Sequence, residues 1–215
     1  MLGITIDNDL KFDRHVSDIC LKANRKLSAL IRMSNFLSLD KRRIVFKAFV
    51  ESQFQYCPLV WMFHNRNLNN KINRIHERAL RTVYNDYESS FETLLDRDCS
   101  CTIHHKNIQR LAIEIYKMIN DQICAPGFKD LFCLRDVCNS RSFSDLIVPS
   151  AKSVSNGQNS LRYIGPLIWN SIPIEIRRTD SFEAFKSKIK KWKPEKCPCR
   201  LCKNYIAGVG FINVT

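Results

Sequence analysis

Residues Asn67–Asp86 read NLNNKINRIHERALRTVYND, and this stretch decides the fold expected for the chain. Its apolar side chains recur at steps of four, three, four and four, which places them on one side of a helix turning by ~100° per residue: Leu68, Ile72, Ile75, Ala79 and Val83. Its basic side chains recur at steps of three, four and three, almost opposite that stripe: Lys71, Arg74, Arg78 and Arg81. The pattern predicts a helix with one side in a core and a row of positive charge on the other.

Such a row suits the backbone of a polyanion, because the arginine guanidinium offers a fork of hydrogen-bond donors to phosphate oxygens. The alternative is an ordinary solvated helix face, since runs of charge often have no other meaning. The helix therefore predicts nucleic-acid contact, with solvent exposure alone as the competing interpretation.

The charge of the whole chain favours a polyanion. Lys and Arg number 34 against 21 Asp and Glu, which gives a formal net charge of +13. Two further basic segments, 22–43 and 177–203, flank the helix in sequence. Excess positive charge fits nucleic acid, an anionic membrane surface or acidic proteins, and it says nothing about the fold.

Composition narrows the class of protein. The chain has 215 residues and is 45% hydrophobic, enough to bury a core. The longest strongly apolar patch, 59–63, is far shorter than the ~20 residues of a membrane span. The N-terminus lacks the features of a secretory signal, so we expect an intracellular protein, nuclear or cytoplasmic, with reduced cysteines among which Cys20 and Cys57 are buried.

Helical spacing recurs along the chain, so the fold class expected is mainly α. Helices are predicted at 13–34, 39–63 with a break at Pro58, 68–84, 102–120 and 181–192. Asp13, Ser38 and Asp180 are the expected N-caps.

Other details complete this expectation. Residues 1–10 are predicted to form a short strand that runs into a turn, and residues 125–159 to be loops. In the helix that follows Ser38, the inward-facing side chains are predicted to be Ile44, Val45, Ala48 and Phe49.

A series of sequence blocks carries a further signal. In order they are LGITIDNDLKFDRHV, FQYCPLVWMFHNRNLNNKINRIHERALRTVYND, SFETLL, TIHHKNIQRLAIEIYKM, GPLIWNSIP and CPCRLC. They are spread over essentially the whole chain, from residue 2 to residue 202, and resemble the C-terminal part of reverse transcriptases encoded by non-LTR retrotransposons of the jockey-like group.

The resemblance implies an organisation. Residues 1–12 would be a remnant of the palm edge strand and its turn, and 13–123 a thumb-like helical bundle that holds a template–primer duplex. A loop-rich region, 124–179, would follow, and then a basic helix and Cys-rich tail, 180–215. The remainder of such a polymerase would be a further partner.

One departure from the family bears on catalysis. Such polymerases hold two Mg²⁺ ions on palm carboxylates that include an adjacent Asp pair, and this chain has no adjacent Asp pair. The resemblance therefore implies a fragment of an RNA-directed DNA polymerase with no Mg²⁺ site and no catalysis of its own.

A zinc site is the other chemical candidate. Cys197, Cys199 and Cys202 offer three thiolates at close spacing, as in small zinc modules. A fourth ligand would have to come from elsewhere in the chain, and the candidates are Cys133, Cys138, His104 and His105. The alternative is a set of free thiols in a basic tail.

Nucleic acid, whether RNA, DNA or a hybrid, is thus the expected partner. Contacts, mainly to phosphates, are predicted for Lys22, Arg25, Lys26, Lys71, Arg74, Arg78, Arg81, Lys186, Lys190 and Lys191. Base stacking or core packing are the two interpretations of Tyr84, Tyr163, Trp169 and Trp192. A helical protein-interaction module and an inert transposon-derived remnant are the alternative functions.

Overall fold

The computed structural model describes residues 3–120, 122, 127–134, 145–152, 157–158 and 160–193, together with the backbone of 205–206 and 210–211. The chain is mainly helical, as predicted. It divides into two compact units, Met1–His104 and His105–Thr215. Among the described residues, no helix combines the length and the apolar character that crossing a membrane requires.

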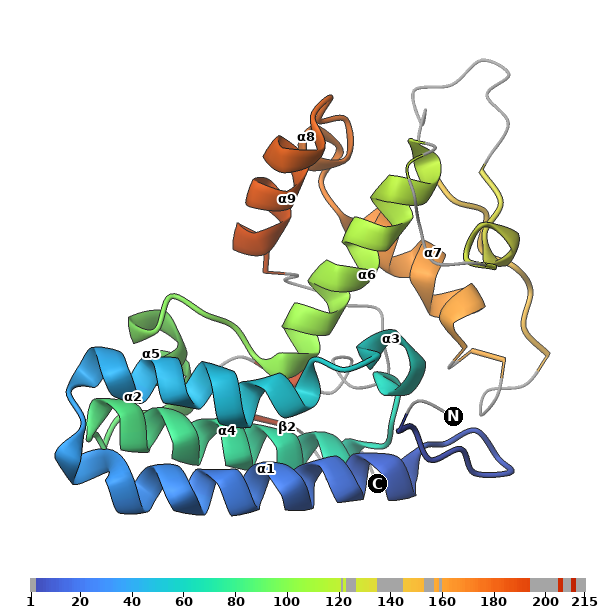
Figure 1. Cartoon of the computed structure of the whole chain (residues 1–215). Coiled ribbons are helices and arrows are strands. Elements are labelled where there is room, and N and C mark those ends of the chain that lie inside the picture. Colours follow the sequence, from blue (N-terminus) through green and yellow to red (C-terminus); the bar gives the residue numbers. More distant parts are fainter. Residues whose placement is uncertain are drawn as a thin grey trace. The chain divides into compact units, whose positions relative to one another are not determined.

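The first unit is a group of helices in which α1, α2 and α4 lie side by side (Figure 1). Its elements, with η for 3₁₀ or π turns, are α1 (Asp13–Met33), η1 (Ser34–Phe36), α2 (Leu39–Val45), η2 (Phe46–Val50), η3 (Glu51–Phe54), α3 (Pro58–Trp61), α4 (Arg66–Tyr84) and α5 (Phe91–Arg97).

The amphipathic pattern of α4 has the predicted result. All five residues of its apolar stripe are buried in the core of the unit, where they meet the buried face of α1, which includes Val16, Ala23 and Leu27. Asn65 caps α4 by accepting a hydrogen bond from the Leu68 N–H at 3.0 Å. Its Nδ2 donates to Asp13 Oδ1 at 2.8 Å, so the first turns of α1 and α4 are joined and the two helices run in the same direction.

The helix after Ser38 differs from its prediction. Ser38 occupies the N-cap position, and Pro58 ends the helical run by starting the short α3, as expected. The predicted inward face is wrong for three of its four residues, because Ile44 and Phe49 are 66% and 55% exposed and Ala48 is exposed too, while Val45 packs against the core. Phe46, Val50 and Phe54 are buried instead.

Two apolar stripes compete on this helix, and the aromatic one is buried. The ring of Phe46 stacks on that of buried His76 of α4, with centroids 5.7 Å apart. The π-helical segment η2 inserts an extra residue into the turn, which changes the register that a regular helix would have kept. Periodicity alone does not choose between the stripes.

The N-terminal stretch forms the predicted turn but not the predicted strand. Leu10 N–H donates to the Asp7 carbonyl at 3.1 Å, and Lys11 N–H donates to Asp7 Oδ1 at 2.7 Å. The described residues of the stretch, 3–10, form no strand, since no neighbouring backbone in the described part pairs with them. Phe12, in the left-handed region, precedes α1, so Asp13 is the first helical residue and not the N-cap.

A buried ion pair joins three helices of the first unit. The side chain of Asp98, at the end of α5, is completely buried and accepts from Arg43 Nε of α2 at 3.0 Å. It also accepts from the Tyr84 hydroxyl at 2.8 Å. Burial, helped by this hydrogen bond, raises the pKa of Tyr84 to about 12. Asp98 therefore fixes the end of α4 against α2 and α5.

The second unit is built on α6 (Ile103–Ile119), whose residues Ile108, Leu111 and Ile115 are buried. The other helical elements are η4 (Lys129–Leu131), α7 (Leu161–Ser171), α8 (Ile174–Arg177) and α9 (Phe182–Lys191). Two strands of two residues each, β1 (Tyr205–Ile206) and β2 (Gly210–Phe211), pair in antiparallel fashion. The ring of Tyr116 stacks on that of Phe185 of α9, with centroids 4.1 Å apart. Ser181 caps α9 through a bond from Ala184 N–H, where Asp180 had been expected.

The segment GPLIWNSIP forms α7 and the turn after it, within the region predicted to be rich in loops. Asn170 both donates to the Leu146 carbonyl and accepts from the Leu146 N–H, at 2.9 and 3.0 Å. Arg177 Nη1 forms an ion pair with Asp145 at 2.5 Å. These residues hold the stretch 145–150 against α7. The segment GPLIWNSIP therefore contributes to the packing of the second unit.

Replacing Ile72 with Asp should unfold the first unit, because the carboxylate would be buried without a partner at a cost of several kcal/mol. Thermal melting followed by circular dichroism measures the loss. The matched control is Ile44→Asp, a change of the same type on an exposed helical position, which should cost about 0.5 kcal/mol. Equal melting temperatures for the two variants would show that the apolar stripe of α4 is not buried.

Replacing Gly165 with Ala should destabilise the second unit by about 1–3 kcal/mol. A Cβ at this position would lie 2.4 Å from Cε1 and 2.8 Å from Cζ of Phe132, so the ring would have to move. Thermal unfolding of Gly165→Ala, Phe132→Leu and the double variant tests this contact. The double variant should lose less stability than the two single changes added together, and strict additivity would contradict the contact.

Candidate nucleic-acid interface

The basic row of α4 faces solvent. Lys71, Arg74 and Arg78 are all exposed and lie outside the buried stripe, with Lys71 nearest to its edge. In the described part of the chain, none of the three forms an ion pair. Their charges are therefore not neutralised by neighbouring carboxylates.

The dimensions of this row suit a phosphate backbone. From Lys71 to Arg78 it covers about 10 Å along the helix, at a rise of about 1.5 Å per residue. One strand of a duplex advances about 3.4 Å per phosphate, so about three phosphates occupy the same length. Three cations on one helix face can thus meet consecutive phosphates.

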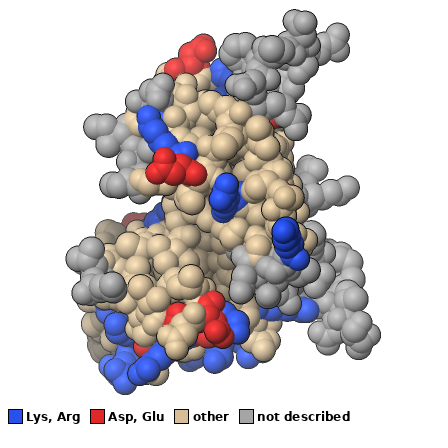
Figure 2. All heavy atoms as spheres, turned by 90° about the vertical axis from the view of Figure 1, so that its right-hand side faces the viewer, with Lys and Arg blue, Asp and Glu red and all other residues tan. Residues whose placement is uncertain are grey.

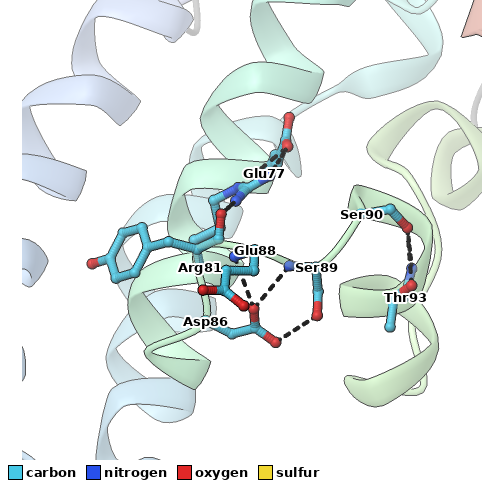
Figure 3. Close-up of polar contacts among 8 residues, drawn as sticks. Glu77, Arg81, Asp86, Glu88, Ser89, Ser90 and Thr93 are labelled. Carbon is cyan, nitrogen blue, oxygen red and sulfur yellow. Dashed lines mark hydrogen bonds and ion pairs between the residues drawn. The ribbon is translucent and has the colours of Figure 1, made fainter.

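Arg81, the fourth residue of the predicted row, is used within the unit. Its Nη2 lies 2.8 Å from Glu77 Oε1, and its Nη1 donates to the carbonyl of Tyr87 (Figure 3). Asn85 ends α4 in the left-handed region, and its N–H donates to the Arg81 carbonyl. Arg81 thus stabilises the turn after α4, a role that the helical period alone does not reveal.

The connection from α4 to α5 is held by short side-chain bonds. The carboxylate of Asp86 accepts from the N–H groups of Glu88 and Ser89 and from the Ser89 hydroxyl, as Figure 3 shows. The Ser90 side chain then caps α5 by accepting from Thr93 N–H at 3.2 Å. The C-terminal end of α4 is therefore held in place by hydrogen bonds within the connection that follows it.

Lys71 lies on the side of α4 that faces α1. Burial raises the pKa of the Cys20 thiol to about 11, and the nearby positive charge of Lys71 opposes that rise. Since Asn65 also bonds to Asp13, Arg25 of α1 comes level with the turn between Arg74 and Arg78. We call these four exposed basic residues of the two parallel helices, Arg25, Lys71, Arg74 and Arg78, the α1–α4 basic face.

The other two predicted contacts on α1 lie on a different side of that helix. Lys26 Nζ is 6.0 Å from the centroid of the Phe49 ring, so this flank faces η2. Lys22 is one turn earlier on the same flank. The structure thus places Lys26 on the side of α1 that faces η2, and helical spacing places Lys22 on the same flank.

Two basic residues were missed by the sequence analysis. Arg14 and Arg32 are exposed and fall on the outward side of α1 with Arg25, at steps of eleven and seven residues. Steps of this size return to the same helix face, so the sequence spacing could have predicted that these two residues lie on the same side of the helix as Arg25. Figure 2 shows basic side chains along the lower margin of the first unit, where α1 lies in Figure 1.

The aromatic candidates for base stacking are engaged elsewhere. Arg97 covers the ring of Tyr84, with Cζ 4.8 Å from the centroid, and Asp98 binds its hydroxyl. Trp169 is buried, while Tyr163 and Trp192 are half-buried in the second unit. The α1–α4 basic face therefore favours phosphate contact over stacking on these rings.

The basic residues predicted in the second unit differ in their surroundings. Lys186 is half-buried, with Nζ 5.6 Å from the Phe182 centroid and 3.9 Å from Glu183. Lys190 and Lys191 are exposed in the last turn of α9, where cations are favoured by the helix dipole.

The predicted zinc ligands Cys197, Cys199 and Cys202 lie outside the described residues. Within the described part, no group of three potential ligands comes together. Of the other cysteines, Cys20 is a buried free thiol as predicted. Cys57 was predicted to be buried but is exposed, because it precedes α3 in the left-handed region at a break between helices.

Comparison with protein-family models, curated proteins and solved structures gives no match for this chain.

The stability of the first unit should fall as the pH drops through 6.5. Burial, and secondarily the charge of Lys22, lower the pKa of His15 from its ordinary value of 6.5. Its Nδ1 accepts a hydrogen bond from Thr5 N–H at 3.3 Å, which protonation would abolish. The unfolded chain therefore binds the proton more readily, so acid favours unfolding.

Melting temperatures from about pH 7.5 to about pH 5.5 test this prediction. His15→Gln, which does not titrate, should lose less stability over that range than the unmodified chain. Parallel curves for the two proteins would show that His15 does not contribute to the pH dependence.

Proposed function

We propose that the first unit binds nucleic acid through the α1–α4 basic face, mainly by phosphate contacts and without catalysis of its own. The observation that carries this proposal is the row Lys71, Arg74 and Arg78, exposed and without ion pairs in the described part of the chain. Like charges three and four residues apart repel one another on a helix, and a bound polyanion relieves that repulsion.

The fixed position of the row supports the same proposal. The opposite side of α4 is buried, its first turn is bonded to α1, and its end is held by Asp98 and Arg81. A cationic row on a rigid element loses little conformational freedom when it binds. Phosphate contacts of this kind carry little base specificity.

The proposal extends to the origin of the chain. We propose that it is the thumb and post-thumb part of a jockey-like non-LTR retrotransposon reverse transcriptase, whose remaining parts would supply fingers, palm and Mg²⁺ site. The resemblance of its sequence blocks supports this, and a helical unit with a basic face suits a thumb. Zinc binding by Cys197, Cys199 and Cys202 stays a prediction.

The test compares Lys71→Ala/Arg74→Ala/Arg78→Ala with the unmodified chain, using a fluorescent RNA–DNA hybrid, a DNA duplex and single strands over ~50–200 mM salt. Affinity should fall for every sequence, and the slope of log K against log salt for the duplex should decrease by about 3. Unchanged affinity would remove the row from the interface.

Two controls separate local contact from total charge. Lys22→Ala/Lys41→Ala/Lys47→Ala removes the same charge from exposed positions outside the α1–α4 basic face and should change the slope much less. Arg81→Ala should act mainly on stability, lowering the melting temperature with little change in affinity, because Arg81 is bonded within the unit. Equal losses in the two triple variants would indicate a response to net charge only.

A further inference from the structure

The hairpin of α1 and α2–η2 carries an uncovered apolar surface. Ile44 is 66%, Phe49 55% and Met33 43% exposed. These are the side chains left outside when Phe46, Val50 and Phe54 take the core positions. Exposed apolar residues that gather in one place mark interaction sites more often than scattered ones do.

The same surface is bordered by lysines. The ammonium of Lys26 lies over the Phe49 ring, and Lys22 precedes it by one turn on α1. Met33 follows Lys26 by seven residues on the same flank, and Lys41 precedes Ile44 by three residues on α2. We call Lys22, Lys26, Met33, Lys41, Ile44 and Phe49 the hairpin face.

The lysines of the hairpin face are not neutralised locally. In the part of the chain that the structure describes, Lys22, Lys26 and Lys41 form no ion pair. Two carboxylates, Asp18 and Asp40, lie on the same helices; the charge of Asp18 acts on His15 and that of Asp40 acts on Arg43. The face thus combines exposed apolar side chains with three lysines that form no ion pair within the described part of the chain.

We propose that the hairpin face binds an acidic amphipathic helix of a partner protein. The apolar side of such a helix would cover Ile44, Phe49 and Met33, while carboxylates on its flanks would meet the three lysines. A second copy of this chain would bring lysines against lysines, and a phosphate backbone would leave the apolar side chains in water. An acidic amphipathic helix would cover the exposed apolar side chains and also pair with the lysines.

This inference is independent of the proposed function. Lys22 and Lys26 lie on the flank of α1 that faces η2, whereas Lys71 faces α1 from α4. Loss of nucleic-acid binding in the Lys71/Arg74/Arg78 variant says nothing about the hairpin face, and the converse also holds.

The probe is a labelled peptide of about eighteen residues with Leu at helical spacing and Glu on both flanks, compared with a twin in which every Glu is Lys. Fluorescence anisotropy with the full chain should show binding of the acidic peptide and not of its twin. Ile44→Gln/Phe49→Gln should weaken that binding about tenfold or more, since two exposed apolar side chains would no longer be covered.

The matched control is Leu21→Gln, which removes an apolar side chain that is 51% exposed on a different side of α1. It should leave the affinity for the acidic peptide unchanged. Leu21, Ile44 and Phe49 are exposed, so the melting temperatures of their glutamine variants should match that of the unmodified chain. Lys22→Glu/Lys26→Glu/Lys41→Glu should reverse the preference and bind the lysine peptide.

Four results would overturn the proposal. The first is failure of the acidic peptide to bind, and the second is equal binding of that peptide to Ile44→Gln/Phe49→Gln. A third is self-association of the chain that this double variant abolishes, which would assign the face to a second copy. A fourth is binding through the face to vesicles containing phosphatidylserine but not to the peptide, which would assign it to a membrane.

Discussion

The packing of α1 against α4 is the contact around which the first unit is arranged. Two amphipathic helices run in the same direction with their apolar sides together, and the Asn65–Asp13 bond fixes their first turns. Because the buried side of α4 packs against α1, α2, η2 and α5, its basic side is left to face solvent. The α1–α4 basic face is therefore a direct result of how the core is made.

Sequence periodicity predicted the helices because a stripe of apolar residues at steps of three and four has only one good solution. It succeeded for α4, where the apolar and basic residues occupy separate sides. It failed on the helix after Ser38, where two apolar stripes share one helix and the partner of Phe46 is His76, thirty residues later in the chain. Such a choice depends on tertiary contacts that a local pattern does not contain.

The candidate site shows the same limit. The exposure of Lys71, Arg74 and Arg78 followed from the period, whereas the role of Arg81 depended on Glu77 and on the carbonyl of Tyr87. Lys26 and Lys71 lie toward different neighbours of α1, and this could be recognised only once the positions of η2 and α4 were known. The sequence shows on which side of a helix a residue lies, but it does not show which neighbouring element packs on that side.

The parallel orientation of α1 and α4 has a consequence for synthesis of the chain. The residues joined by the Asn65–Asp13 bond are 52 positions apart, and closing a loop of that length costs roughly 3.5 kcal/mol or more in chain entropy. Until α4 has left the ribosome, Val16, Ala23 and Leu27 of α1 lack the part of the core that α4 supplies. The nascent first unit is thus expected to keep the α4-facing side of α1 uncovered until α4, which ends at Tyr84, has been synthesised, and to be complete only when α5 and Asp98 follow.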